Sequence, residues 1–222
     1  MTQIFSRHAD SRLRLAAGLG LAAVAFLAVS GFFVARSGAA WQVGVPARQP
    51  IPFSHAVHAG QLGLDCRLCH AGVERQAAAG MPTAETCLGC HRQVWNVAAQ
   101  FAPLRSALAL DTPVAWASVS RLPDHVRFHH GAHMAASVPC ETCHGQVRTM
   151  PQTVRAETLS MQWCLDCHRD PDPRRRPAGA VLARGGVPGD TPPEPLTGLG
   201  ARRFAHFGVE ISALTRCSTC HR

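Results

Sequence analysis

The sequence contains no lysine and no tyrosine, and it has little charge and few aromatic residues. All 22 basic residues are therefore Arg, only 16% of the 222 residues are charged, and only 6% are aromatic. The absence of lysine excludes any site in which a lysine amine is a ligand. In contrast, the chain has ten Cys and 13 His, which is a dense supply of cysteine for a cytosolic enzyme with an ordinary hydrophobic core. This composition disfavours a soluble α/β enzyme.

All ten cysteines belong to five Cys-x-x-Cys-His motifs, and no cysteine is left over. The motifs are Cys66–Cys69–His70, Cys87–Cys90–His91, Cys140–Cys143–His144, Cys164–Cys167–His168 and Cys217–Cys220–His221. This spacing is typical of c-type haem attachment, in which two thioether bonds hold the porphyrin on one turn of chain and the adjacent His binds the iron as proximal ligand. We therefore expect five covalently bound haem c groups, held by these ten Cys and five proximal His.

Zinc sites, disulfides and thioredoxin-like redox pairs are the other interpretations of these cysteines. Structural zinc sites take four ligands each, and five identical units do not combine into sets of four. A thioredoxin-like motif would occur once, near a βαβ pattern, and it needs no His after the second Cys. The recurrence of the His in all five motifs favours haem.

The amino-terminal part predicts a membrane anchor. Arg7, Arg12 and Arg14 precede an uncharged run of 21 residues from Leu15 to Ala35, which is long enough to cross a bilayer as a helix. The basic flank belongs on the cytoplasmic side. The alternative is a cleaved signal peptide, whose apolar region is normally shorter, at about 7–15 residues. We expect a retained anchor in the cytoplasmic (inner) membrane, with the haem domain on the periplasmic side.

The net charge of +8 does not indicate a nucleic-acid partner. The stub before the apolar run accounts for part of the positive charge, and each ferric haem adds about one negative charge through its propionates. With five haems, the net charge of the exported part falls to about +1. We therefore expect no nucleic-acid binding.

The spacing of the motifs indicates an internal repeat. Their first cysteines are separated by 21, 53, 24 and 53 residues, an alternation that is typical of duplicated modules. The pattern F-x-H-x-x-H precedes the first motif at Phe53–His58 and the third at Phe128–His133, and half of it precedes the fifth at Phe204–His206. The candidate distal ligands of the five irons are His55, His58, His130, His133 and His206, with Met161 or Met150 as the alternative fifth ligand. His125 and His129 fit no repeat, and we interpret them as hydrogen-bond partners.

The expected fold is a multihaem cytochrome c that is mostly irregular, with short α-helices packed around five haems and one N-terminal transmembrane helix. Each motif is expected to open a short helix, and Val94–Leu108 is expected to be helical apart from Pro103. The predicted segments are a basic stub (1–14), the anchor (15–35), a first two-haem module with its connection (36–127), a second two-haem module (128–170), a Pro/Gly-rich loop (171–203) and a single-haem C-terminal unit (204–222).

Electron transfer is favoured over catalysis. Five distal candidates for five irons leave no open axial position, which catalysis on a small substrate would need. The Cys-x-x-Cys-Lys site of some multihaem reductases is excluded because lysine is absent. About 187 residues follow the anchor, and five haems in a globule of that size must lie close together. We do not expect the chain to be catalytic by itself.

The module of F-x-H-x-x-H with Cys-x-x-Cys-His resembles class III multihaem cytochromes. More specifically, the chain is similar to the membrane-anchored pentahaem cytochrome c component of alternative complex III, from about residue 51 to the end except for the Pro-rich loop. The segments that carry this resemblance are Phe53–His58, Met81–Cys87, Leu122–His130, Leu159–Arg169 and Cys217–Arg222.

The resemblance implies a role within a respiratory or photosynthetic complex. In that family an integral membrane subunit oxidises quinol, and an iron–sulfur subunit lies beside the pentahaem subunit. Electrons pass on to a monohaem cytochrome or another soluble carrier and then to a terminal oxidase. The alternative is a self-sufficient, membrane-anchored multihaem quinol dehydrogenase that feeds a periplasmic reductase. Such proteins often carry a Met two residues after the first motif's His, where this chain has Gly72.

Overall fold

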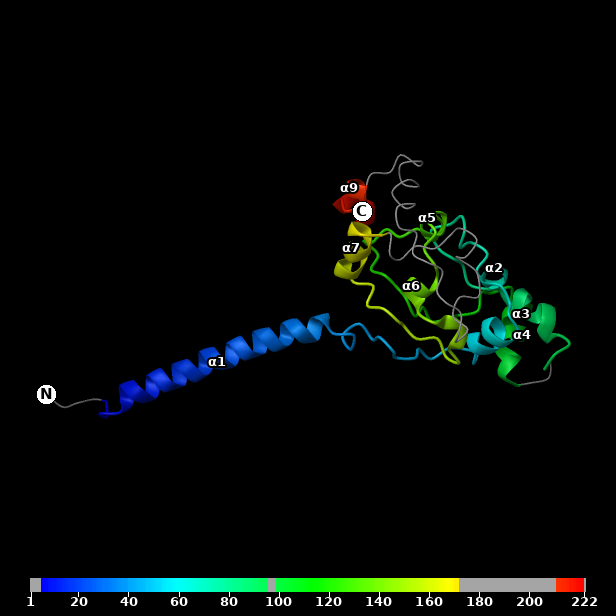
Figure 1. The fold of residues 1–222 in the computed structure, drawn as a ribbon. Coiled ribbons are helices and arrows are strands. Elements are labelled where there is room, and N and C mark those ends of the chain that lie inside the picture. Colours follow the sequence, from blue (N-terminus) through cyan, green and yellow to red (C-terminus); the bar gives the residue numbers. More distant parts are fainter. Residues whose placement is uncertain (1–4, 96–98, 172–210, 222) are drawn as a thin grey trace. The chain divides into compact units, whose positions relative to one another are not determined.

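The computed structural model describes residues 5–95, 99–171 and 211–221 (Figure 1). The chain divides into two compact units, Met1–Val43 and Gly44–Arg222, and each is described by itself. His206 and the Pro/Gly-rich loop beyond residue 171 lie outside the described residues.

The first unit consists mainly of one long helix, α1 (Ala9–Arg36). Its Ala and Leu residues favour a helix, and its Val and Phe residues are tolerated in one. No residue of α1 is buried in the structure. The helix is long and apolar enough to cross a membrane. The helix ends at Ser37, whose hydroxyl donates to the carbonyl oxygen of Val34 at 2.7 Å. The Arg36 guanidinium lies 3.7 Å from the centre of the Phe32 ring. The expected apolar helix at 15–35 is confirmed within α1, and its retention as an anchor stays a prediction.

The second unit is built from short helices joined by irregular chain. Its helical elements are η1 (Ala56–Gln61), α2 (Cys66–Cys69), α3 (Ala84–His91), η2 (Ala99–Phe101), α4 (Ala102–Ala109), α5 (His130–Ala135), α6 (Glu141–His144), η3 (Val147–Thr149), α7 (Met161–Arg169), α9 (Ile211–Leu214) and α10 (Cys217–Cys220). Within the described residues, extended pairing is limited to two isolated bridges, Pro46 with Val154 and Val126 with His221. The expectation of a mostly irregular chain with short helices is confirmed for this part.

Side-chain caps determine where three of the motif-bearing helices begin. Asp65 accepts a hydrogen bond from the Arg67 N–H at the start of α2, Thr83 caps α3 and Ser160 caps α7, as such residues do at helix starts. The expectation that each motif opens a helix holds for α2 and α10, and Cys140 directly precedes α6. It is wrong for Cys87 and Cys164, because the caps start α3 and α7 three residues before these cysteines.

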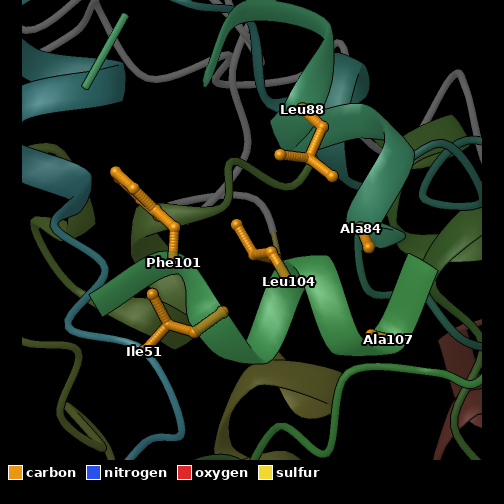
Figure 2. Packing of buried hydrophobic residues seen from close by; sticks show 6 residues of the cluster. All are labelled: Ile51, Ala84, Leu88, Phe101, Leu104 and Ala107. Carbon is orange, nitrogen blue, oxygen red and sulfur yellow. The ribbon is translucent and has the colours of Figure 1, made fainter. Parts of the chain in front are cut away.

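The apolar core of the described residues is small and lies around α3 and α4. It consists of Ile51, Ala84, Leu88, Phe101, Leu104 and Ala107 (Figure 2). Leu104 is only 1% exposed. The expected helix at Val94–Leu108 is corrected here, because α4 begins only at Ala102 and Pro103 lies in its first turn. Proline is tolerated there because the first helical N–H groups have no partner within the helix.

Candidate functional site

Each Cys-x-x-Cys-His motif forms one helical turn that brings its two thiols and its His to the same place. The N–H of His70 donates to the carbonyl oxygen of Cys66 at 2.8 Å, and the His144–Cys140 and His221–Cys217 bonds are equivalent at 2.9 and 2.8 Å. In α3 and α7 the motif lies within a longer helix, which imposes the same turn. A four-residue turn is therefore the local framework of every motif.

The structure places one further His ring opposite the His of each motif. The ring-centroid distances are 6.5 Å for His55–His70, 6.1 Å for His58–His91, 6.4 Å for His130–His144, 6.1 Å for His133–His168 and 5.7 Å for His125–His221. Four of the five predicted distal candidates thus lie opposite a predicted proximal His. The two members of each F-x-H-x-x-H pattern lie opposite the first and second motifs of their own module.

The spacing of these pairs fits a metal between two imidazoles. A metal-bound imidazole nitrogen lies about 2 Å from the metal, so two rings that bind opposite sides of one iron have centroids about 6 Å apart. The observed distances of 5.7–6.5 Å agree with this value. The arrangement can therefore hold five six-coordinate irons.

Hydrogen bonds at Nδ1 orient most of these rings and leave Nε2 for a metal. An oxygen atom lies 2.8–3.1 Å from Nδ1 in seven of the ten His. The pairs are His55 with Thr153 Oγ1, His58 with Ser54 O, His70 with Gly80 O, His91 with Val94 O, His130 with Ala77 O, His133 with His129 O and His168 with Leu214 O. A ligand His commonly donates its second ring nitrogen in this way, which selects the tautomer and the ring orientation.

A phenylalanine connects the two His of each F-x-H-x-x-H pattern. Phe53 contacts His55 edge-on at 4.8 Å and stacks on His58 at 4.4 Å. Phe128 repeats both contacts with His130 and His133 at the same distances, and the interplanar angles agree within about one degree. The repeat in the sequence therefore corresponds to a repeat in side-chain geometry, and each Phe lies between two neighbouring sites.

His125, which the sequence analysis interprets as a hydrogen-bond partner, is instead the ring that the structure places opposite the fifth motif. Its ring lies opposite His221 with 14° between the ring planes, held there because Val126 pairs with His221 and the Arg127 N–H donates to the carbonyl oxygen of Cys220 at 2.6 Å. His129 has the hydrogen-bonding role expected of it, since its Nδ1 accepts from the Ala132 N–H at the start of α5.

The other candidates for the fifth distal ligand have different surroundings. Met161 begins α7 and its side chain is 64% exposed. Met150 lies near Gly145, because a Cβ added to Gly145 would lie 3.4 Å from the Met150 methyl carbon. Its backbone carbonyl accepts a hydrogen bond from the Ala56 N–H.

Burial keeps several of the His rings neutral. Burial, followed by the effect of the neighbouring His70, lowers the pKa of His55 to about 4. Burial likewise lowers the pKa of His144 to about 4, followed by the effect of His130, and burial lowers the pKa of His133. A neutral imidazole at pH 7 is the form that binds a metal.

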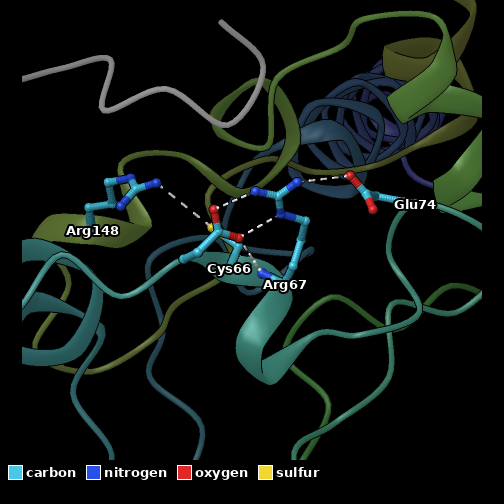
Figure 3. Close-up of polar contacts among 5 residues, drawn as sticks. Cys66, Arg67, Glu74 and Arg148 are labelled. Carbon is cyan, nitrogen blue, oxygen red and sulfur yellow. Dashed lines mark hydrogen bonds and ion pairs between the residues drawn. The ribbon is translucent and has the colours of Figure 1, made fainter. Parts of the chain in front are cut away.

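The motif thiols lie close to one another and to an arginine. The S–H of Cys140 donates to Cys66, which lowers the pKa of Cys66 to about 6 and raises the pKa of Cys140. The Arg148 guanidinium lies 3.9 Å from the Cys66 sulfur, while the Arg67 guanidinium bonds Glu74 at 3.3 Å (Figure 3). The first cysteines of two different motifs are thus in contact.

One buried donor fits a bound group with an acceptor oxygen. Trp116 Nε1 is inaccessible to solvent and has no hydrogen-bond partner within the described part of the chain, and its ring lies 6.3 Å from that of Phe53. A buried N–H without a partner costs about 1–3 kcal/mol. A propionate of a haem bound in the first module would supply such an acceptor.

The thiols and imidazoles are not arranged as a site for a bare metal ion. In residues 5–95, 99–171 and 211–221, no group of three or more His, Cys, Asp or Glu side chains has the geometry to hold one. A structural zinc site would need four such ligands around one point. The paired imidazoles instead have the separation that suits a planar macrocycle between them.

Comparison with known proteins supports a multihaem cytochrome. No family model matches the chain. Over 97 residues the chain is 34% identical to a protein of Nitratidesulfovibrio vulgaris, the multihaem cytochrome c subunit of menaquinone reductase. The match covers 43% of this chain and 45% of that relative, so it spans less than half the length of each. Over this part the chain is similar to a multihaem cytochrome c.

Proposed function

We propose that this chain is a membrane-anchored pentahaem c-type cytochrome that relays electrons within a quinone-linked membrane complex. The observation that carries the proposal is the set of five His–His pairs, each of which has one ring directly after a Cys-x-x-Cys pair. The ten motif cysteines hold the macrocycles, and the five motif His are the proximal ligands. The distal ligands are His55, His58, His130 and His133, with His125 at the fifth site.

The chain's own residues position and shield these groups. Haem iron, when bound, supplies one-electron redox chemistry, and its potential depends on the axial ligands and on burial. The backbone carbonyls at Nδ1 hold the ligand rings in place, and Phe53 and Phe128 pack between neighbouring sites. Because each site would offer the iron one His on either side, no ligand position would be left open for a substrate, and this favours a relay over catalysis.

The quinone link and the membrane location are supported by two independent features. Helix α1 is apolar enough to cross a bilayer, and Arg7, Arg12 and Arg14 precede its uncharged run from Leu15 to Ala35, which supports a cytoplasmic start. The relative in Nitratidesulfovibrio vulgaris belongs to a menaquinone reductase. We propose that the haem domain is periplasmic and that the quinone site lies on an integral membrane subunit, as the resemblance to alternative complex III implies. The expected partners are that subunit, a monohaem cytochrome and an iron–sulfur subunit, with a soluble carrier or terminal oxidase as acceptor.

The direction of electron flow separates two candidate functions. In an alternative complex III, electrons leave quinol and pass through the pentahaem subunit to a carrier. The name of the relative describes the opposite reaction, in which a quinone is reduced, so a complex that feeds electrons into the quinone pool is the second candidate.

The test is stopped-flow absorbance of the haems with a quinol, for the purified chain and for its complex in mild detergent. We expect reduction in the complex and no fast reduction of the chain alone, because the quinol site lies on another subunit. Fast reduction of the isolated chain would instead make it a quinol dehydrogenase by itself. The pre-reduced complex, mixed with oxidised quinone, decides the direction: rapid reoxidation would favour the quinone-reducing candidate.

A further inference from the structure

The two modules are related by a nearly constant shift along the chain. Phe128 follows Phe53 by 75 residues, and Cys140 follows Cys66 by 74 residues. Positions from Phe53 to the segment after the first motif therefore have equivalents in the second module, so contacts between the modules at these positions can be compared for reciprocity.

Backbone hydrogen bonds between the modules are reciprocal. The N–H of Ala56 donates to the carbonyl oxygen of Met150 at 3.0 Å, and the N–H of Gly131 donates to the carbonyl oxygen of Gln76 at 3.1 Å. Ala56 is equivalent to Gly131, and Gln76 is equivalent to Met150. Each module thus pairs the turn that bears its distal His with the segment that follows the first motif of the other module.

A distal His side chain of each module also reaches the other module, although the two partner residues are not equivalent positions. His55 Nδ1 lies 2.8 Å from the Thr153 hydroxyl of the second module, and His130 Nδ1 lies 2.8 Å from the Ala77 carbonyl oxygen of the first. The approach is close, because a Cβ added to Gly131 would lie 2.8 Å from the carbonyl oxygen of Glu74. Contacts that are mutual in this way define a two-fold relation between two equivalent bodies.

The first motifs of the two modules meet at the centre of this relation. Cys66 and Cys140 are equivalent residues, and their side chains are in contact. The Arg148 guanidinium, four residues after His144, also lies 3.9 Å from the Cys66 sulfur. Under a two-fold operation, a residue that contacts its own equivalent lies at the axis. The sites of His70 and His144 are therefore neighbours across the axis.

The remaining motifs lie outside this central pair. Phe53 contacts the ligand rings of both sites in the first module, and Phe128 does so in the second. The C-terminal motif adjoins the second motif of the second module, since the carbonyl oxygen of Leu214 accepts from His168 Nδ1 at 2.8 Å.

We infer that the two modules pack about an internal pseudo-two-fold axis, and that the five motifs are ordered in space differently from their order in the chain. In space the proximal ligands follow one another as His91, His70, His144, His168 and His221. The inference rests on the proposed function only in that each motif holds a haem. Figure 1 shows the corresponding elements in the same order across the second unit, from α3 and α2 through α6 to α7 and α9.

This order assigns different positions to the motifs. The first motif of the chain is internal, whereas the second and the fifth occupy the two ends. A redox partner that docks at an end therefore meets the site of His91 or the site of His221. The symmetric part comprises four motifs, and the fifth extends the row on one side only.

The direct test is X-ray diffraction from the haem-loaded full chain at the iron absorption edge. We expect five irons in one row, with the irons of His70 and His144 as neighbours in its inner part and those of His91 and His221 at the ends. A matched variant, Cys217→Ala with Cys220→Ala, is expected to lose one terminal iron and keep four. The inference is overturned if the iron of His91 lies between those of His70 and His144, or if the row follows chain order. A haem-loaded chain with fewer than five irons would overturn the pentahaem proposal instead, while the Ala56–Met150 and Gly131–Gln76 bonds would still report the packing.

A measurement in solution tests the reciprocal contact without crystals. Gly131→Leu in the haem-loaded full chain is expected to raise amide hydrogen exchange in residues 74–80 of the first module by about tenfold or more, because a side chain there displaces the other module. The control is Gly20→Leu in α1, outside both modules, since a Cβ at Gly20 meets nothing within 4 Å. Unchanged exchange in residues 74–80 of a folded Gly131→Leu protein would contradict the proposed packing.

Discussion

His125 lies opposite His221, with ring centroids 5.7 Å apart and 14° between the ring planes, although 96 residues separate them in the chain. The pair is held by backbone contacts on both sides of His125 and the C-terminal motif, through the Val126–His221 bridge and the Arg127–Cys220 hydrogen bond. The C-terminal motif therefore takes its partner ring from the segment directly before the second module.

Exchange of His125 for Met tests the fifth axial pair. We expect His125→Met to convert one of the five haems from His/His to His/Met ligation and to raise its reduction potential, because a thioether stabilises ferrous iron relative to imidazole. Redox titration with electron paramagnetic resonance measures both effects. His206→Met is the matched control and is expected to leave all five haems unchanged. A raised potential in the His206 variant alone would assign the ligand to His206.

Removal of the Trp116 N–H tests whether this donor serves a bound propionate. Trp116→Phe keeps most of the ring volume, and we expect it to lower the potential of one haem by up to about 40 mV, which corresponds to one hydrogen bond of about 1 kcal/mol. The cause is that a propionate without its donor carries more negative charge and favours ferric iron. Trp163→Phe is the control, because Trp163 Nε1 already donates to Glu157 at 3.0 Å. Equal potentials in wild-type and Trp116→Phe protein would exclude the propionate contact.

Truncation of Leu104 tests the importance of the small core. Leu104→Ala is expected to lower the free energy of unfolding by about 2–5 kcal/mol, because it leaves a cavity among side chains that cannot close it. Guanidinium-induced unfolding of the haem-loaded protein measures the change. Leu110→Ala, at a side chain that is 71% exposed, is expected to change it by less than about 0.5 kcal/mol. Similar losses in both variants would mean that this core contributes little.

The Asp65–Arg67 pair predicts a specific dependence of stability on pH. Hydrogen bonds from Arg67 lower the pKa of Asp65 to about 2, from its ordinary value of 3.8. A lowered pKa in the folded state stabilises the fold above about pH 4, and this contribution is lost as the pH falls towards 2. Because the pair is about half exposed, solvent screens it and its contribution is small.

Asp65→Asn keeps a good helix cap but removes the charge. We expect the variant to be less stable than the wild type at about pH 5 and to match it at about pH 2, as unfolding titrations at both values would show. A stability difference that is the same at both pH values would show that the carboxylate charge is not the cause.

The features that could be predicted from the sequence are those defined by the spacing of residues over short stretches of chain. The five motifs are defined by covalent chemistry within five residues, and the two F-x-H-x-x-H patterns recur with the same neighbours, so Phe53 and Phe128 occupy matching positions in the structure. His125 could not be found in this way, because its pattern occurs once. Its position three residues before Phe128, within the segment Leu122–His130, could have identified it as a candidate ligand.

The packing of the two modules could not be predicted because it is carried by backbone groups. The bonds from Ala56 to Met150 and from Gly131 to Gln76 join main-chain atoms, and no side-chain type is required at three of the four positions. Only at Gly131 does the packing require a particular residue, since a Cβ there would collide with the carbonyl oxygen of Glu74. The start of α4 was mispredicted for a related reason, since apolar residues before Ala102 resemble a helix but the first turn is set by Pro103.

The small apolar core has a consequence for how the protein is made. Within the described residues only seven hydrophobic side chains are buried, far fewer than a polypeptide of this size needs to compensate the entropy lost on folding. The missing apolar contacts are those that the macrocycles supply, so we expect the exported chain to become compact only as they are attached. An unloaded chain would stay open to proteases, and the amount of folded protein would then follow the supply of haem rather than the rate of translation.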